Sequence, residues 1–250
     1  SWTFMVYLAA DNNLESFAID DFLEMAAAGS DANLNIVVQF DRIPGYDSRY
    51  GDWTSTKRFR ITPGMVPDAN SAVQDIGEAD MGDPQTAIDF VNWARATYPA
   101  ERYVLVWWNH GGGWLTALAP QEIGPNDFCW DDTDGSDALT SAELYQILDA
   151  VTNGGAEPID LVGFDACLMA MWEVDNQVKP FGSAVSVSSE EAEPGDGWPY
   201  DTILGDLKGN PGWSAAALGD DIVVRYYQSY GNGETQSAKD LAGPYTALNQ

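Results

Sequence analysis

The sequence predicts a single α/β domain, a three-layer α/β/α sandwich whose central sheet is mostly parallel. Patterns typical of strands and of helices alternate along the 250 residues, and neither an internal repeat nor a linker interrupts them. Hydrophobic residues make up 45% of the chain, which is enough for a sizeable core. Ligands of such sheets bind beyond the carboxyl ends of the strands, so we expect functional residues at that edge.

The N-terminal part has the pattern of a strand–helix–strand unit. The apolar run 2–10 is rich in aromatic and branched residues, which is typical of a buried strand, and 14–28 has apolar residues at helical spacing. The run 34–40 is the next strand, so the crossover should be right-handed. The segment 41–80 is punctuated by proline and glycine, but 53–61 alternates enough for a β-hairpin or an antiparallel edge element.

The rest of the chain continues the alternation. Asp83 and Pro84 are suited to the start of a helix that runs to about Tyr98. A buried strand at 103–109 and a long loop at 111–137 follow. The remaining expected elements are a helix at 141–151 that begins with the capping box Thr140–Glu143, a strand at 159–167, a helix at 168–178, a strand at 183–189, an acidic loop at 190–200, a helix at 213–230 and a last strand at 235–241.

The charge balance restricts the partners. With 39 acidic and 11 basic residues, the chain has a formal net charge of −28. Such a surface repels nucleic acid and anionic membranes, and it attracts cations such as basic peptide segments and Ca²⁺. Solubility in a salty or extracellular setting explains the charge at least as well. No run approaches the roughly 20 apolar residues that a membrane span needs.

Cysteine usage and the start of the chain bear on location. Cys129 and Cys167 are the only cysteines, too few for a disulfide framework, and we take Cys129 as structural. The chain begins at Ser1 without a methionine, which we interpret as a mature chain whose export signal has been removed. We therefore expect a secreted, periplasmic or cell-surface protein.

Two of the predicted strands end in the residue types that nucleophilic acyl transfer requires. His110, the only histidine, follows the strand at 103–109, and Cys167 ends the strand at 159–167. If these strands are parallel neighbours, an imidazole meets a thiol at one sheet edge. A nearby imidazolium, and the N-terminus of a helix that starts at Leu168, would favour the nucleophilic thiolate.

Each residue also has a plainer explanation. A free cysteine is most often a small buried residue, a lone histidine is usually structural, and Gly111 to Gly113 would make a simple turn. The glycines nevertheless allow a close approach of the backbone to a substrate, so that the N–H groups of Gly111 and Cys167 would hold an oxyanion. His110 and Cys167 together, each at a strand end, favour an enzyme.

Three motifs resemble the clostripain family of cysteine peptidases: NHGGGW at 109–114, DDT at 131–133 and FDACLM at 164–169. The segments 11–14 and 235–241 extend the resemblance over almost the whole chain. The family belongs with caspases, legumains, gingipains and separases. The resemblance implies a caspase-like fold, a His–Cys dyad and cleavage of peptide bonds after arginine or lysine.

The resemblance also implies roles for individual residues. His110 is the general acid or base, Cys167 is the nucleophile, and Asp165 matches the acidic residue that binds the basic P1 side chain. A carboxylate suits that role because it forms charge-assisted hydrogen bonds, although a structural, loop-capping aspartate is the alternative. Glu190 and Asp196, on the loop after the next strand, either line the same pocket or are solvated. The sequence reveals no third group that would orient His110.

The acidic cluster at 131–137 is a candidate Ca²⁺ site, with Asp131, Asp132 and Asp134 as its candidate ligands. Resemblance to clostripain makes calcium plausible, but the spacing does not fit an EF-hand. A turn that caps the following helix is a slightly better explanation of the cluster. The peptidase chemistry itself is expected to need no cofactor.

Maturation by self-cleavage is a further point of comparison. Members of the family often cut themselves after a basic residue between the histidine and cysteine motifs, but 103–178 contains no lysine or arginine. A cut of that specificity is therefore expected at Lys179, at Lys208 or within 42–60, if one is needed. Because the chain ends soon after its last predicted strand, we expect one peptidase domain over 1–250 that lacks C-terminal elements of the family.

The main hypothesis is thus a cysteine endopeptidase that acts on protein or peptide substrates with a basic P1 residue. One alternative keeps the fold and the dyad but has another P1 preference, because pocket residues on loops change easily. A second alternative is a catalytically silent binding module on the same scaffold, and the intact dyad argues against it.

Overall fold

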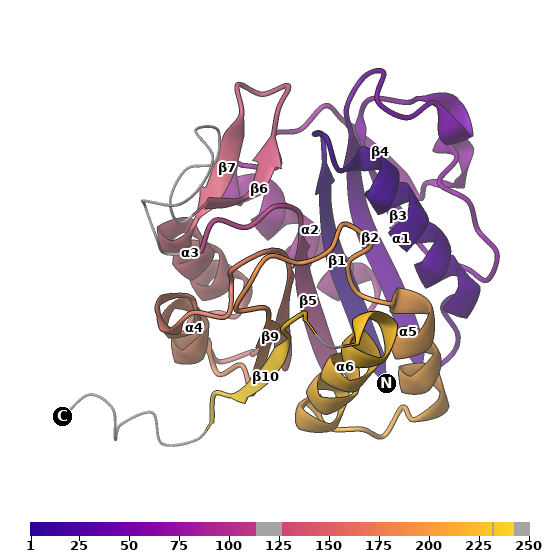
Figure 1. Ribbon diagram of the computed structural model, residues 1–250. Helices are drawn as coiled ribbons and strands as arrows, with labels where there is room; N and C mark the ends of the chain where they lie inside the picture. Colours follow the sequence, from indigo (N-terminus) through magenta and orange to yellow (C-terminus); the bar gives the residue numbers. More distant parts are fainter. Residues whose placement is uncertain (114–126, 232, 243–250) are drawn as a thin grey trace.

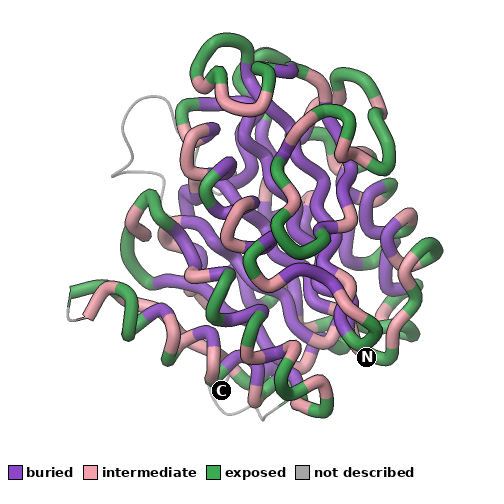
Figure 2. The backbone as a smooth tube through the Cα atoms, turned by 90° about the vertical axis from the view of Figure 1, so that its right-hand side faces the viewer, coloured by how far each residue is buried: buried purple, intermediate pink, exposed green. Residues whose placement is uncertain are grey.

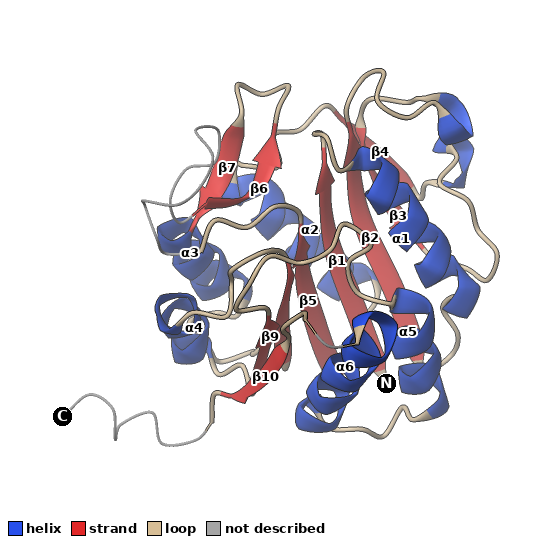
Figure 3. Cartoon of the chain, viewed as in Figure 1, coloured by secondary structure: helices blue, strands red, loops and turns tan. Residues whose placement is uncertain are grey.

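The chain folds into the three layers that the alternating pattern predicts (Figure 1). A computed structural model describes residues 1–113, 127–231 and 233–242. Trp114 of the NHGGGW motif and the 114–126 part of the expected long loop lie outside the described residues. Within these described ranges, eight strands form one sheet, and helices cover both of its faces (Figure 3).

The central sheet is mostly parallel. Its strands are β1 (Trp2–Ala10), β2 (Leu34–Arg42), β3 (Thr56–Arg60), β4 (Gln74–Gly77), β5 (Arg102–Trp108), β8 (Leu161–Asp165), β9 (Val185–Ser188) and β10 (Ser237–Asp240). They lie in the order β10-β9-β8-β5-β1-β2-β3-β4. The five strands from β9 to β2 are parallel, whereas β10, β3 and β4 pair antiparallel at the two edges. The antiparallel edge element expected at 53–61 is therefore confirmed as β3.

Helices bury both faces of the sheet. One face is covered by α1 (Glu15–Ala28), α5 (Tyr200–Gly209) and α6 (Ala215–Tyr230), and the other by α2 (Pro84–Thr97), α3 (Ser141–Val151) and α4 (Trp172–Val178). Short 3₁₀ turns occur at Arg49–Gly51, Ala69–Ser71 and Lys179–Phe181. The apolar residues of β1 point into the two cores in turn, which explains why this strand is apolar at every position except Thr3. Figure 2 shows the strands buried between the more exposed helices.

The long loop expected at 111–137 contains a strand. β6 (Asp127–Asp131) pairs antiparallel with β7 (Asp137–Thr140) in a small separate sheet. The acidic segment 131–137 is the turn of this hairpin and does not cap α3, whose N-cap is the predicted Thr140 with its capping box. The pattern was hard to recognise because the pairing is irregular, and Cys129 has a φ of 57°.

The helix expected to start at Leu168 begins four residues later, at Trp172. Leu168 has a φ of 64°, outside the helical region, and its N–H donates to the carbonyl of Glu191 at 3.0 Å. The N–H of Ala170 donates to Ser189 at 2.8 Å. These backbone groups therefore pair with the loop after β9, and Cys167 does not lie at a helix N-terminus.

α5 was not expected, although its buried residues are spaced as in an amphipathic helix; they are Tyr200, Ile203, Leu204 and Leu207. α6 begins two residues later than predicted, where Ser214 accepts a hydrogen bond from the N–H of Ala217 as N-cap. Across the described part of the chain, no helix combines the length and the apolar character that crossing a membrane would require.

Candidate active site

His110 lies just beyond the carboxyl end of β5, in the middle of the sheet. The side-chain amide of the buried Asn109 donates to the carbonyl oxygens of Ala9 and Trp130. These hydrogen bonds fasten the end of β5 to the end of β1 and to β6. The backbone that carries His110 is therefore fixed from two sides.

The imidazole of His110 contacts Asn13, with Nε2 at 2.7 Å from Oδ1. An amide oxygen can only accept, so this contact favours the tautomer that carries its proton on Nε2. The ring of Trp130 packs edge-on against the imidazole, with ring centroids 6.4 Å apart. Burial lowers the pKa of His110, and the negative charge of Asp132 opposes this shift. The imidazole is thus held in position, with its neutral form favoured.

Cys167 lies two residues beyond β8, and its thiol is held by the loop that follows β9. The N–H of Glu193 points at Sγ from 3.2 Å, and the neighbouring N–H of Leu168 bonds to Glu191 on the same loop. Cys167 is partly exposed, whereas Cys129 is buried. The thiol in turn lies 3.9 Å from the carbonyl oxygen of Glu193, so the backbone of this one loop residue fixes the position of the sulfur.

Gly111 allows the two strand ends to approach. A Cβ on this residue would overlap the carbonyl oxygen of Cys167 and lie 3.1 Å from its nitrogen. The adjacent N–H of Gly112 bonds to Asp127. In the part of the chain that the structure describes, the N–H groups of Gly111 and Cys167 donate to no acceptor. Two backbone donors are therefore available side by side.

One cavity of about 240 Å³ joins these residues. Its lining includes His110, Cys167 and Asp165, together with Glu193 and Gly197. β5 and β8 are parallel neighbours, with Trp108 opposite Asp165 in the register. This pairing brings His110 and Cys167 to the same edge of the sheet, where both line the cavity.

Asp165 is the last residue of β8, and its carboxyl group belongs to a buried cluster of carboxyl groups that borders the cavity. It is only 4% exposed and accepts hydrogen bonds from the Tyr200 hydroxyl at 2.8 Å and from the N–H of Trp198 at 3.2 Å. Burial raises the pKa of Asp165, and the hydrogen bonds to its carboxyl group oppose this rise. Asp21 of α1 is also buried; it accepts from the Trp108 indole at 2.6 Å, and burial followed by the charge of Asp165 raises its pKa well above its usual range.

Glu193 is the third member of this cluster, and the sequence did not single it out. Burial raises the pKa of its carboxyl well above the usual range, and the charge of Asp165 adds to the shift. Within the described residues, none of Asp21, Asp165 and Glu193 forms an ion pair. Three buried carboxyls beside a cavity thus lack a cationic partner.

Glu190 and Asp196, the other candidates for substrate binding, are exposed and do not line the cavity. A role for either residue in binding substrate stays a prediction. The sequence feature that could have revealed Glu193 is its position on the same acidic loop as Glu190 and Asp196. For Asn13 the signal was its place after β1, the strand beside β5.

The candidate Ca²⁺ ligands lie on the β6–β7 hairpin. Asp131 and Asp134 come together with Glu78, and carboxylate oxygens of these three residues lie within 4.8 Å of one another. The described groupings of this kind do not include Asp132. Calcium binding by Asp131, Asp132 and Asp134 therefore stays a prediction.

Comparison with known proteins identifies one family. The clostripain family matches residues 6–243. Clostripain of Hathewaya histolytica is 32% identical over 231 residues, an alignment that covers 84% of this chain and 43% of the relative. The chain thus spans less than half the length of that relative.

Solved structures share the fold. One is a secreted C11 cysteine protease from Bacteroides thetaiotaomicron in complex with an irreversible peptide inhibitor, with a TM-score of 0.72 at 23% identity. The match covers 97% of this chain and 66% of that protease chain. An inactive zymogen C11 protease from Parabacteroides distasonis has a TM-score of 0.68 at 20% identity, covering 96% and 62%. The expected caspase-like α/β sandwich is confirmed.

Proposed function

The chain belongs to the clostripain family, and on this premise we propose that it is a cysteine endopeptidase that cleaves protein or peptide substrates after arginine or lysine. The observation that carries the proposal is the composition of a single cavity. Its lining combines the imidazole of His110, the thiol of Cys167 and the carboxyls of Asp165 and Glu193. A nucleophile, a proton carrier and a binding site for a cation are therefore contiguous.

In the proposed reaction, the thiolate of Cys167 attacks the scissile carbonyl carbon. The negative charge that forms on the carbonyl oxygen is stabilised by the N–H groups of Gly111 and Cys167, which have no other acceptor among the described residues. As the C–N bond breaks, the imidazolium of His110 gives its proton to the departing amine. Water then attacks the thioester, His110 accepts the proton of the water, and the thiolate leaves.

Asn13 supports this sequence of proton transfers. Its amide oxygen lies 2.7 Å from Nε2 of His110 and accepts a hydrogen bond from the Nε2–H group in both charge states of the ring. Nδ1 then remains to exchange a proton between the thiol, the amine and water. We assign Asn13 as a positioning residue, because it acts on the imidazole and not on the substrate.

The unpaired carboxyls support a basic P1 side chain. A buried carboxylate without a partner is costly, and an arginine or lysine that enters the cavity supplies both charge and hydrogen bonds. Asp165 is the central member, since Asp21 and Glu193 both feel its charge. An uncharged or acidic P1 side chain would leave the cluster without compensation.

The proposal extends to location and cofactors. A secreted, periplasmic or cell-surface protein fits the net charge of −28, and the similar protein from Bacteroides thetaiotaomicron is described as secreted. The steps above use thiol, imidazole and backbone groups only, so the chemistry requires no cofactor.

The test is turnover of peptide amides that differ only at P1. We expect the wild type to cleave after Arg and Lys and Cys167→Ala to be inactive, while Cys129→Ala retains activity if it folds. Equal turnover by wild type and Cys167→Ala would overturn the assignment of the nucleophile. Cleavage after Asp or Asn but not Arg would show another P1 preference. A folded protein whose Cys167 reacts with no thiol-directed peptide probe would be a silent binding module.

A further inference from the structure

A second cavity lies between α2 and the two strands at the β4 edge of the sheet, and we call it the edge cavity. Its volume is about 500 Å³, which is within the range of sites that bind small molecules. Its lining includes Arg58 of β3, Gln74 and Ile76 of β4, and Asp89 of α2. It shares no lining residue with the cavity at the candidate active site, so the two are separate.

Arg58 is the unusual residue of the edge cavity. It is only 6% exposed, and its guanidinium packs on the ring of Trp93, 4.9 Å from the ring centroid. Nε donates to the side-chain oxygen of Gln39 at 2.9 Å, and Nη1 donates to that of Gln74 at 3.2 Å. Both acceptors are neutral amides, and Arg58 forms no ion pair with any described residue. In a chain with 39 acidic residues, a buried arginine without an acidic partner is unexpected.

The guanidinium of Arg58 also has hydrogen-bonding capacity left. It carries five N–H groups, and the bonds to the two amides use only two of them. Nη2 donates to no acceptor within 1–113, 127–231 and 233–242. Burial lowers the pKa of Arg58, and the negative charge of Asp89 is the first influence that opposes this shift. A buried cation with free donors is costly, and a planar carboxylate that binds its open edge removes that cost.

Asp89 provides the opposite charge on the α2 side of the edge cavity. Its carboxylate is exposed and accepts a hydrogen bond from the Gln85 amide at 2.7 Å, but it forms no ion pair with a described residue. Thr86 and Asn92, three residues away on either side, share this face of the helix and also line the cavity. Asp89 and Arg58 thus border one cavity without pairing with each other.

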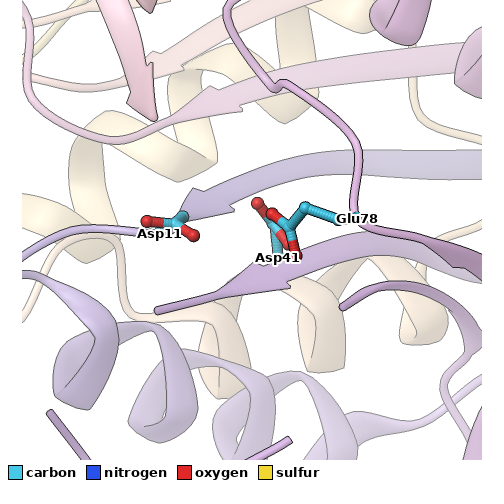
Figure 4. Close-up of side chains that lie close together, drawn as sticks. All are labelled: Asp11, Asp41 and Glu78. Carbon is cyan, nitrogen blue, oxygen red and sulfur yellow. The ribbon is translucent and has the colours of Figure 1, made fainter. Parts of the chain in front are cut away.

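The other acidic groups nearby face elsewhere. Glu78, which directly precedes the lining residue Ala79, is grouped with Asp11 and Asp41 instead (Figure 4). Asp89 is therefore the only acidic residue among the described residues that line the edge cavity. One positive and one negative group suit a ligand that carries both charges. A phosphate dianion would bind Arg58 but would be repelled by Asp89.

We propose that the edge cavity binds the zwitterion of a free α-amino acid with an apolar side chain. The carboxylate binds the open edge of the Arg58 guanidinium, the ammonium binds Asp89, and the side chain contacts Ile76 and Ala79. In a free amino acid the two charges are separated by a single carbon atom, whereas in a peptide they lie at opposite ends of the chain. The ligand would connect α2 to β3 and should therefore stabilise the fold.

The experiment measures binding by titration calorimetry, with L-leucine, N-acetyl-L-leucine, L-leucinamide and inorganic phosphate as probes at equal ionic strength. We expect L-leucine to bind at one site and to raise Tm. N-acetyl-L-leucine lacks the ammonium and L-leucinamide lacks the carboxylate, so each should bind at least tenfold more weakly, since each loses one charge-assisted interaction. Phosphate should neither bind the cavity nor displace L-leucine.

Three variants assign the binding to this cavity. Asp89→Asn changes an exposed residue, so it should fold normally and bind L-leucine only as weakly as the wild type binds N-acetyl-L-leucine. Arg58→Lys keeps the charge but loses the planar edge, and its affinity for L-leucine should fall at least tenfold. Arg60→Lys is the matched control, because it makes the same substitution two residues further along β3, outside the lining, and should bind like the wild type.

The proposal is wrong if L-leucine does not bind at millimolar concentration, or if wild type and Asp89→Asn bind it equally well. Tighter binding of phosphate or of N-acetyl-L-leucine than of L-leucine would show a simple anion site instead. If Arg58→Lys fails to fold, the comparison of wild type with Asp89→Asn still decides. Cys167→Ala should bind L-leucine like the wild type, because the edge cavity is separate from the candidate active site. Failure here therefore leaves the proposed peptidase function intact.

Discussion

Asn13 illustrates how a residue far from the candidate catalytic histidine in sequence can be brought into contact with it. It lies 97 residues before His110, yet its amide oxygen is 2.7 Å from Nε2 because β1 and β5 are neighbours in the sheet. A polar contact of this kind fixes the tautomer and the direction of the ring. Its removal should affect proton transfer and leave substrate binding unchanged.

We therefore predict that Asn13→Ala lowers kcat by roughly tenfold to a hundredfold with little change in KM, a loss in the range of a general acid or base that is out of position. Asn13→Asp should keep the acceptor but add a charge, which raises the pKa of His110 and moves the pH profile of kcat upward. Steady-state kinetics across a range of pH measure both the loss in kcat and the shift of the pH profile. If kcat and KM instead change by similar factors and the pH profile of kcat does not shift, Asn13 has only a structural role.

Glu193 leads to a prediction of how the affinity for a basic P1 side chain depends on pH. Burial raises the pKa of Asp165 and, further, of Glu193, and a cationic P1 side chain binds best when both are ionised. Affinity for such a side chain should thus increase as pH rises through these raised pKa values, well above the ordinary range of a carboxyl group.

For an arginine substrate, we predict an acidic limb of kcat/KM that moves to lower pH in Glu193→Gln, because the carboxyl group with the more strongly raised pKa then no longer has to ionise. The shift should appear in KM. Glu234→Gln, an exposed change that lies outside the cavity lining, is the control and should leave the limb in place. If the two variants have identical profiles, Glu193 does not contribute to P1 binding.

At the scale of secondary-structure elements, the close contact of two strand ends depends on Gly111. A Cβ there would overlap the carbonyl oxygen of Cys167, whereas a Cβ on Gly205 of α5 would meet nothing within 4 Å. These two glycines provide a matched pair, since the same substitution has opposite expected effects.

Gly111→Ala should push the histidine and cysteine segments apart, lower kcat/KM by at least a hundredfold and reduce stability. Gly205→Ala should keep full activity and stabilise the protein by about 0.5–1 kcal/mol, because alanine is favoured over glycine within a helix. Urea unfolding and kinetics on both proteins test this. Normal activity in Gly111→Ala would mean that the two segments adjust freely.

The elements that the sequence predicted well are those whose pattern is complete within one segment. β1 is a continuous buried run, α2 and α3 carry an apolar period and their own caps, and the positions of all three agree with the prediction. The start of α4 could not be predicted, because the N–H groups of Leu168 and Ala170 bond to the loop after β9. The same holds for β6, whose partner follows only after an irregular turn.

The residues of the candidate site also divide into those that the sequence predicted and those whose place depends on the fold. His110 and Cys167 could be proposed because each lies at the end of a recognisable strand, and Asp165 because the family resemblance implies it; the structure places all three at one cavity. Asn13 and Glu193 lie on loops, where the backbone path decides which side chain turns inward. Sequence position alone therefore suggested Glu190 and Asp196, and the fold turned Glu193 toward the cavity instead.

For the whole molecule, the excess of acidic residues determines how stability depends on pH. Besides the net charge of −28, several carboxyls are buried without a basic partner. Glu24 of α1, which accepts a hydrogen bond from the N–H of Tyr200, has its pKa raised by burial to about 7, and Asp21, Asp165 and Glu193 are raised as well. Folding raises these pKa values, so the folded protein binds protons more tightly than the unfolded chain.

We predict that Tm falls as pH rises from 6 to 8 in the presence of EDTA. A carboxyl whose pKa is raised on folding contributes stability that is fully present below its unfolded pKa, near 4, and is lost as pH rises through its folded pKa. For Glu24 that loss centres at about pH 7. His110, whose pKa is lowered, acts in the opposite direction but is a single group. Glu24→Gln should flatten the curve in scanning calorimetry, whereas Asp149→Asn, on an exposed part of α3, should not. A Tm that is constant or rises between pH 6 and 8 would show that these carboxyls are ionised at little cost in the folded protein.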